Sequence, residues 1–284
     1  PSPEKSITNS FLAGLEGGLT SLQQAITSGM QQASLTNLKA VYEAIVFIKH
    51  GVNLFEQVLS KDKYQQFKQM AKGLIDELGW LENAQHINDL TVKSGRYRKK
   101  IEYSKQLVST LKLERSRFPD ENAIKALLSG EQINHFQLAI LQFLVAPSFD
   151  ENHQISDVQT IKAFSLIALE KSLKDLIKVS EGKSELAPIE YIVIHHHLYR
   201  SLLTGSWFGR LYNEDNRVAY RSPWLDVLQG SEELSTLFLL QKELQSLEES
   251  PTKLITWLDD KIEHLVGAIH QSYHSAISIE PYWR

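Results

Sequence analysis

Histidines and an arginine occur at anion-binding spacing in one apolar, periodic stretch of the sequence. His195, His196 and His197 are consecutive, and consecutive side chains on a helix point about 100° apart, so the three cannot chelate one metal together. Arg200 lies four residues after His196 and three after His197, so either imidazole can share a helix face with the guanidinium. Such a pair can hold an anion when the imidazole is protonated. The alternative is a partly buried helix with imidazoles that only face solvent.

A second cationic group is denser and lies near the middle of the chain. Its members surround one turn and the start of a predicted helix, with Glu102 as the only acid nearby: Lys93, Arg96, Arg98, Lys99, Lys100 and Lys105. Arg96, Lys99 and Lys100 fall at helical neighbour spacing. Cations at a helix start oppose the helix macrodipole, which favours a role other than helix stability. The group is either a surface for a polyanion or an ordinary solvated face.

Other chemistries find no support in the sequence. His270 and His274 have the spacing of a helical zinc site, but no His-Glu-x-x-His motif surrounds them. No Glu is followed by His three residues on, which excludes the di-iron bundle pattern. There is no Gly-rich phosphate loop, no nucleophile elbow and no cysteine. We therefore predict no catalytic residue, no metal site and no cofactor for this chain.

The stretch from Thr36 to Leu59 organises the predicted fold. Apolar residues recur there at steps of three and four and form one buried stripe: Leu38, Val41, Ile45, Ile48, Val52, Phe55 and Leu59. A second, more polar stripe is rotated from it: Lys39, Tyr42, Val46, Lys49 and Asn53. Lys49 and His50 are then either remnants of a phosphate-binding helix or part of an ordinary solvated face.

Helical periodicity covers nearly the whole chain, so we predict an all-α fold of two antiparallel four-helix bundles with short loops. Residues 1–118 form the first predicted bundle, residues 119–156 connecting helices and a loop, and residues 157–284 the second bundle. The fourth helix of the first bundle is predicted to end before Pro119. Residues 210–222 are predicted to be an irregular surface loop, followed by helices over 231–249 and 251–276.

Composition limits the class of protein. The 284 residues are 42 % hydrophobic, enough for a buried core, and the formal charge of −4 argues against nucleic-acid binding. Thirteen Lys/Arg and seven Asp/Glu in residues 61–117 give that stretch a balance of +6. The absence of cysteine, of a signal peptide and of a membrane-spanning run predicts a cytoplasmic protein without a membrane partner. Because the chain begins with Pro1 rather than Met, we expect it to be a fragment.

Short motifs spread along the chain resemble one known family. They are Gly14-Leu15-Glu16, Ile48-Lys49-His50 with Leu54-Phe55, Arg200-Ser201-Leu202-Leu203 leading to Trp207-Phe208, and the ending Glu280-Pro281-Tyr282-Trp283. Together they resemble the CHAD domain, the conserved-histidine α-helical domain. The chain is most similar to the C-terminal half of bacterial CYTH–CHAD inorganic triphosphatases.

The resemblance implies two helical bundles around a basic groove that binds inorganic polyphosphate. Lys49 matches one basic position of that groove, and His196 with His197 match a basic pair, whereas Lys39 takes the place of the usual His. Several other groove positions have lost their charge: Tyr42, Val46, Phe47, Ile189 and Tyr199. The predicted polyanion-binding set is Lys39, Lys49, His50, Arg96, Lys99, Lys100, His196, His197 and Arg200.

The resemblance also implies a division of labour in the parent protein. Triphosphatase activity belongs to the CYTH domain, whose Glu-x-Glu-x-Lys mark is missing here because no two Glu residues lie two apart. We therefore expect a non-catalytic accessory domain with an N-terminal CYTH domain in cis as partner, in a parent that is an inorganic triphosphatase. The alternative is a degenerate CHAD domain that acts only as a structural or protein-interaction module.

Overall fold

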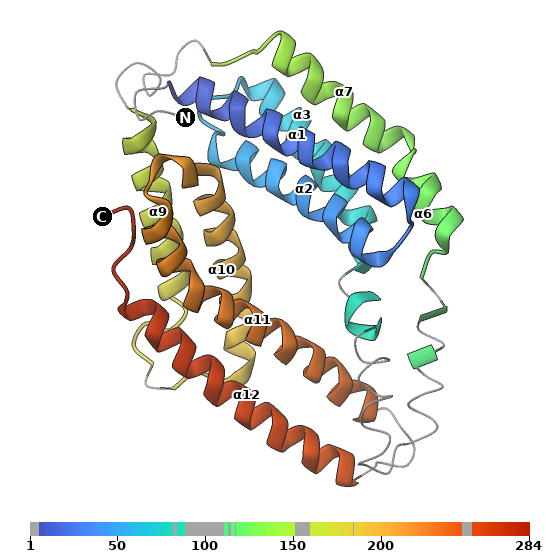
Figure 1. Cartoon of the computed structure of the whole chain (residues 1–284), viewed down its shortest axis with the longest axis vertical. Coiled ribbons are helices and arrows are strands. Elements are labelled where there is room, and N and C mark those ends of the chain that lie inside the picture. The colour runs from blue at the N-terminus through green and yellow to red at the C-terminus, as the bar shows by residue number, and fades with distance from the viewer. Residues whose placement is uncertain are drawn as a thin grey trace. The chain divides into compact units, whose positions relative to one another are not determined.

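The computed structural model describes residues 6–81, 84–88, 111–112, 115–116, 118–150, 160–183, 185–245 and 252–284. Helices account for most of these ranges (Figure 1): α1 (Ile7–Gln31), α2 (Leu35–Leu54), α3 (Lys61–Glu77), α6 (Glu121–Leu128), α7 (Glu131–Val145), α9 (Ile161–Ile177), α10 (Pro188–Phe208), the short 3-10 helix η1 (Gly209–Leu211), α11 (Glu214–Gln245) and α12 (Thr252–Ser278). The described ranges contain no named strand, only an isolated antiparallel bridge between Leu59 and Phe149. The predicted all-α class is confirmed.

The chain divides into two compact units that interleave along the sequence. Unit 1 comprises Pro1–Leu81, Pro119–Ser172 and Leu203–Tyr212, and unit 2 comprises Glu82–Phe118, Leu173–Leu202 and Asn213–Arg284. The last turns of α10 therefore belong to unit 1, whereas its first turns belong to unit 2. These units differ in extent from the contiguous segments 1–118 and 157–284 that the sequence predicted.

In unit 1, four helices pack around one core. α1 contacts α2 and α7, α2 contacts α3, and α3 contacts α7, and Figure 1 shows α1 and α2 side by side. α7 is the fourth helix of this set, whereas the sequence predicted a segment that ends before Pro119. Most of that segment lies outside the described residues.

Local sequence signals explain where the first helices begin. Ser6 and Ser34 precede α1 and α2, and their hydroxyl oxygens accept hydrogen bonds from the amides three residues on, at 3.2 Å each. α2 therefore begins at Leu35, one residue before the predicted start at Thr36, and Ser34 caps it. α2 also ends at Leu54, five residues earlier than predicted, because Phe55 to Leu59 turn toward the Phe149 bridge.

The core of unit 1 is rich in aromatic rings. Phe11 on α1 lies 5.1 Å from Phe55 and 6.0 Å from Phe143 on α7, measured between ring centroids. Phe55, Phe11 and Phe143 are each at most 1 % exposed. Rings at these separations pack edge-on or tilted and add to the burial of apolar area, so they fix the positions of α1, α2 and α7 relative to one another.

In unit 2, the long helices α11 and α12 pack against each other along much of their length. α11 begins at Glu214, so the predicted irregular loop over 210–222 is wrong. The Oδ1 atom of Asn213 accepts a hydrogen bond of 3.0 Å from the backbone N–H of Asn216 and so caps the start of α11. Pro223 lies within α11. Polar composition concealed this helix because most of its first two turns face solvent.

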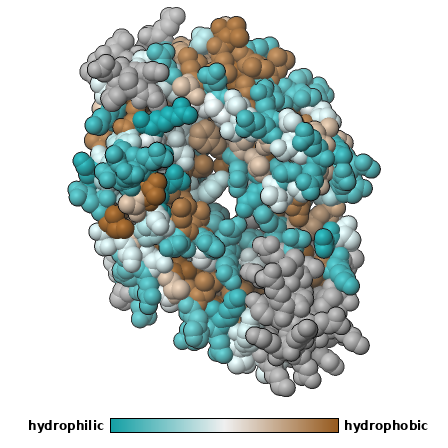
Figure 2. All heavy atoms as spheres, viewed as in Figure 1, coloured by the Kyte–Doolittle hydropathy of each residue, from teal (hydrophilic) through white to brown (hydrophobic). Residues whose placement is uncertain are grey.

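The face of the molecule drawn in Figure 2 is mainly polar. Figure 2 shows hydrophilic atoms over most of this face, with hydrophobic atoms in smaller groups. Exposed apolar side chains on α7 include Leu138, Leu141 and Val145. Within the described ranges, none of the helices is both long and apolar enough to cross a bilayer.

Candidate functional site

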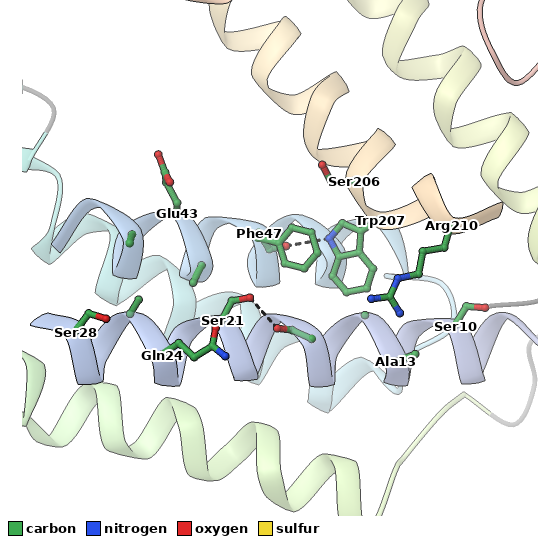
Figure 3. Close-up of a pocket in the computed structure, with 15 residues that line it drawn as sticks. Ser10, Ala13, Ser21, Gln24, Ser28, Glu43, Phe47, Ser206, Trp207 and Arg210 are labelled. Atoms are coloured by element: carbon green, nitrogen blue, oxygen red, sulfur yellow. Dashed lines mark hydrogen bonds between the residues drawn. The ribbon is translucent and has the colours of Figure 1, made fainter. Parts of the chain in front are cut away.

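Trp207, near the end of α10, fills a space that two glycines leave open between α1 and α2. A Cβ atom built on Gly14 would lie 2.0 Å from the Trp207 ring, and one built on Gly51 would lie 1.8 Å from it. The indole Nε1 donates a hydrogen bond of 3.1 Å to the backbone oxygen of Phe47, and the Phe47 ring stacks on the indole at 4.8 Å (Figure 3). Both glycines are therefore required by the close approach of this ring.

Beside Trp207 lies a pocket of ≈ 650 Å³ between α1 and α2. Its walls are mostly small side chains of the two helices, such as Ala13, Gly17, Ser21, Ala40 and Ala44. They follow helical spacing along one face of each helix, which lets the two backbones form a shallow groove.

Two charged residues line this pocket, Glu43 on α2 and Arg210 on η1. Figure 3 shows the Arg210 side chain extending toward α1 beside the Trp207 ring. Ser10, another lining residue, is 7 % exposed, and its buried hydroxyl has no hydrogen-bond partner in the described structure. A single guanidinium facing a carboxylate-containing wall provides little net attraction for a polyanion.

The predicted cations of α2 do not line this pocket. Lys49 lies two positions from both Phe47 and Gly51, which places it about 160° around the helix from either residue. Lys39 is half-buried and pairs with Glu43 at 3.9 Å. His50 is also half-buried, and its Nε2 lies 2.9 Å from the hydroxyl of Thr204, which is 2 % exposed. Of the three, Lys39 and His50 are engaged inside unit 1.

The predicted cations of α10 lie in unit 2 and have more access to solvent. His196 and Arg200 are exposed, whereas His197 is half-buried. Glu190 is the only acid in α10, and Lys183 and the Ala187 amide bind it, which lowers the pKa of this carboxyl. His196 and Arg200 are therefore exposed on a helix whose one acid, Glu190, is already bound near the start of the helix.

The first histidine of the run has a different environment. The Nδ1 atom of His195 lies 3.0 Å from the hydroxyl of Ser231 on α11, and Ser231 is fully buried. This contact ties α10 to α11 and gives His195 a packing role. His195 thus lies against α11, whereas His196 is exposed, as expected for consecutive side chains on a helix.

The remaining predicted residues cannot be placed. Arg96, Lys99 and Lys100 lie outside the described residues. Of the described members of the predicted set, Lys39, Lys49 and His50 belong to unit 1 and His196, His197 and Arg200 to unit 2.

Sequence reasoning missed the pocket and its arginine. Arg210 stands in a stretch predicted to be a polar loop, and nothing in its spacing distinguished it. Gly14 and Gly51 gave a usable signal, because a glycine inside an otherwise helical pattern often marks close packing.

A second polar pair in unit 2 links α10 to α12. The hydroxyl of Tyr191, which is 1 % exposed, lies 2.9 Å from Nδ1 of His270, whose ring packs 4.3 Å from that of His274. Burial raises the pKa of Tyr191 to about 12, with smaller contributions in the same direction from Tyr273 and Glu190. Among the described residues, no three His, Asp or Glu side chains gather as a metal site would require.

Comparison with solved structures decides the fold. The chain matches the CHAD domain from the plant Ricinus communis with a TM-score of 0.66 and 13 % identity, over 99 % of this chain and 94 % of the other. It matches PptA from Streptomyces chartreusis with a TM-score of 0.69 and 10 % identity, over 97 % of this chain and 100 % of the other.

The chain has the fold of a CHAD domain. No protein-family model and no curated protein matches the sequence. At 10–13 % identity the CHAD fold is retained while most side chains differ, so the fold alone carries no binding or catalytic residue over to this chain. Any expectation of polyanion binding therefore depends on individual residues of this chain, such as those of α2 and α10.

Proposed function

We propose that this chain is a non-catalytic module that binds inorganic polyphosphate or a similar condensed phosphate, with exposed cations of α10 in unit 2 as one contact and Lys49 of α2 in unit 1 as another. In the parent protein it would act as the accessory half of a CYTH–CHAD triphosphatase, guiding phosphate chains to an N-terminal CYTH domain in cis. The observation that carries the proposal is that His196 and Arg200 are both exposed and lie four residues apart on α10.

The chemistry of the pair fits this ligand. A guanidinium forms bidentate, charge-assisted hydrogen bonds to phosphate oxygens. A neighbouring imidazole becomes a second cation when it is protonated, and an anion held by both favours that protonation. Lys49, half-exposed on α2, supplies a further cation that has no ion pair among the described residues.

Titration of the full chain with labelled polyphosphate at low and high salt tests the proposal. Affinity should fall between about 50 mM and about 300 mM salt, because each bound cation releases counterions from the ligand. The double variant Lys49→Glu/Arg200→Glu should weaken binding at low salt by about tenfold or more, since charge reversal turns attraction into repulsion.

A charge-matched control separates the site from the net charge of the protein. Lys72 on α3 and Arg115 are both exposed, and the variant Lys72→Glu/Arg115→Glu changes the net charge by the same amount. It should weaken binding only slightly. The absence of binding at low salt, or equal losses in the two double variants, would refute the proposal. Hydrolysis of triphosphate by this chain alone would overturn its non-catalytic part.

A structural or protein-interaction module is the second candidate function. Two observations favour it: Lys39 is paired with Glu43, and His50 is bonded to the buried Thr204. Both groups then serve the packing of unit 1 rather than a ligand. Under this function Lys49→Glu/Arg200→Glu leaves stability and all phosphate titrations unchanged.

A further inference from the structure

The first turns of α11 carry buried nitrogen donors that have no hydrogen-bond partner in the described structure. They are Nε of Arg217, Nε of Arg221 and Nε1 of Trp224. The three residues recur at steps of four and three, so they lie within about 60° of one another on a single helix face. We call these three residues the α11 donor cluster.

Unpartnered donors at these positions are costly. Trp224 is 1 % exposed and the side chain of Arg217 is 22 % exposed, so water reaches this face poorly. A buried polar group without a partner costs about 1–3 kcal/mol, and a buried charge costs more. Natural structures contain few such groups, and each one requires an explanation such as a bound ion.

The two arginines also repel each other. Burial lowers the pKa of the Arg221 guanidinium, and the positive charge of Arg217 lowers it further, whereas Tyr282 acts in the opposite direction. Like charges four residues apart on a helix are mildly destabilising even at the surface. The acid that faces Arg217 is Glu214, which is 80 % exposed and 3.6 Å away, so its attraction is largely screened by water.

Aromatic residues surround the cluster on one side. The C-terminal tail packs over α11, with the rings of Tyr282 and Trp283 centred 5.5 Å and 5.2 Å from that of Tyr220. Trp224 in turn meets Tyr273 of α12 at 5.8 Å. These apolar walls reduce the local dielectric and strengthen any charge-assisted hydrogen bond made there.

The chemistry of the cluster determines what it can bind. Guanidinium and indole groups donate hydrogen bonds and accept none, so a metal ion or another cation has no ligand atom here. The missing partner must accept hydrogen bonds, and it must be negative to offset two guanidinium charges. A carboxylate offers two oxygens, whereas a phosphate offers three or more and matches three donors from separate side chains.

We propose that Arg217, Arg221 and Trp224 form a binding site for a phosphate-type oxyanion, with the guanidinium groups as the charged donors and the indole as the third donor. The site belongs to unit 2 and shares no residue with the cations of α2 and α10. The two proposals can therefore be tested independently.

Inorganic phosphate is the probe for the test. At constant ionic strength, replacing chloride by phosphate should raise the Tm of the full chain by about 2–4 °C, because a ligand that binds only the folded state stabilises it. The variant Arg221→Met should lose this rise and should be at least as stable as the wild type in chloride, because it removes a half-buried cation that lies near the like charge of Arg217. Arg115→Met, at an exposed arginine, is the matched control and should keep the rise.

A second variant guards against misfolding. Arg221→Lys keeps the charge but loses the bidentate fork, so phosphate affinity measured by calorimetry should fall by about tenfold or less and remain detectable. The variant Lys49→Glu/Arg200→Glu should bind inorganic phosphate at this site as the wild type does. If that variant loses polyphosphate but keeps the phosphate-induced rise, the two sites are confirmed as separate.

Three results would overturn the inference. The site is refuted if phosphate does not raise the Tm of the wild type, or if it raises the Tm of Arg221→Met by the same amount. Equal stabilisation by acetate shows that the cluster does not select phosphate. A marked loss of stability for Arg221→Met in chloride shows that an acidic side chain of the chain itself already pairs with Arg221.

Discussion

Tyr191 illustrates how one buried group can make stability depend on pH. Its hydroxyl is enclosed and bonded to His270, and burial raises its pKa to about 12, whereas an unfolded tyrosine ionises near pH 10. Between these values the folded state holds a proton that the unfolded state releases. The contribution is fully present below about pH 10 and is lost as the pH rises toward about 12.

The variant Tyr191→Phe should remove this dependence. At pH 8 it should be less stable than the wild type by about 1 kcal/mol, because the hydrogen bond to His270 is lost. As the pH rises from about 9 to about 11.5 the difference should shrink and reverse, since a shift of about two pKa units corresponds to roughly 2–3 kcal/mol. Urea unfolding of both proteins across this range measures the difference, and a constant difference would contradict the prediction.

At the residue scale, the sequence predicted some environments and missed others. It predicted that His195, His196 and His197 point in different directions, because helix geometry alone turns consecutive side chains by about 100°. It could not predict that His50 would bond to Thr204, which lies 154 residues away. It gave no sign that the Nε atoms of Arg217 and Arg221 are buried, since periodicity does not distinguish a half-buried arginine from an exposed one.

At the element scale, the most reliable predictions came from apolar stripes. The stripe from Leu38 to Val52 is buried as expected. Pro188 is the first residue of α10, a position where proline is favoured. The helix over 214–230 was missed because Asn213, Asn216, Arg217 and Pro223 suggested a loop. Tertiary packing of Tyr220 and Trp224 against the tail and α12 outweighs that local preference.

The approach of Trp207 to α1 gives a matched pair of predictions in one helix. Gly14→Ala places a methyl group against the indole, which is held by the Phe47 stack and backbone bond, so stability should fall by about 1–3 kcal/mol. Gly17→Ala meets no atom within 4 Å and should raise stability by about 0.5–1 kcal/mol through helix propensity. Urea unfolding followed by far-UV circular dichroism compares the two, and equal effects would show that Trp207 does not fill this space.

At the scale of the whole molecule, the sequence predicted the fold class and the family resemblance but not the partition of the chain. Periodicity shows which face of a helix is buried and says nothing about which distant segment covers it. Unit 1 takes α7 and the segment Leu203–Tyr212 from far downstream of α1 and α2. A division at residue 118, chosen because Pro119 ends a helical pattern, therefore separates residues that share one core.

This interleaving predicts the behaviour of fragments. Residues 1–118 lack α7 and Trp207, so Phe11 and Phe55 would lose the rings that bury them, and this fragment should show no cooperative unfolding. Residues 1–212 contain every segment of unit 1 and should keep a cooperative transition with a near-ultraviolet signal from packed aromatic rings. Circular dichroism during urea titration distinguishes the two cases.

A cooperative, aromatic-packed transition in residues 1–118 would instead show that the fourth helix of the first bundle comes from before Pro119. The variant Trp207→Ala in the full chain tests how much of the difference between the two fragments comes from the indole. It should lower the free energy of unfolding by about 3–5 kcal/mol and leave the transition cooperative.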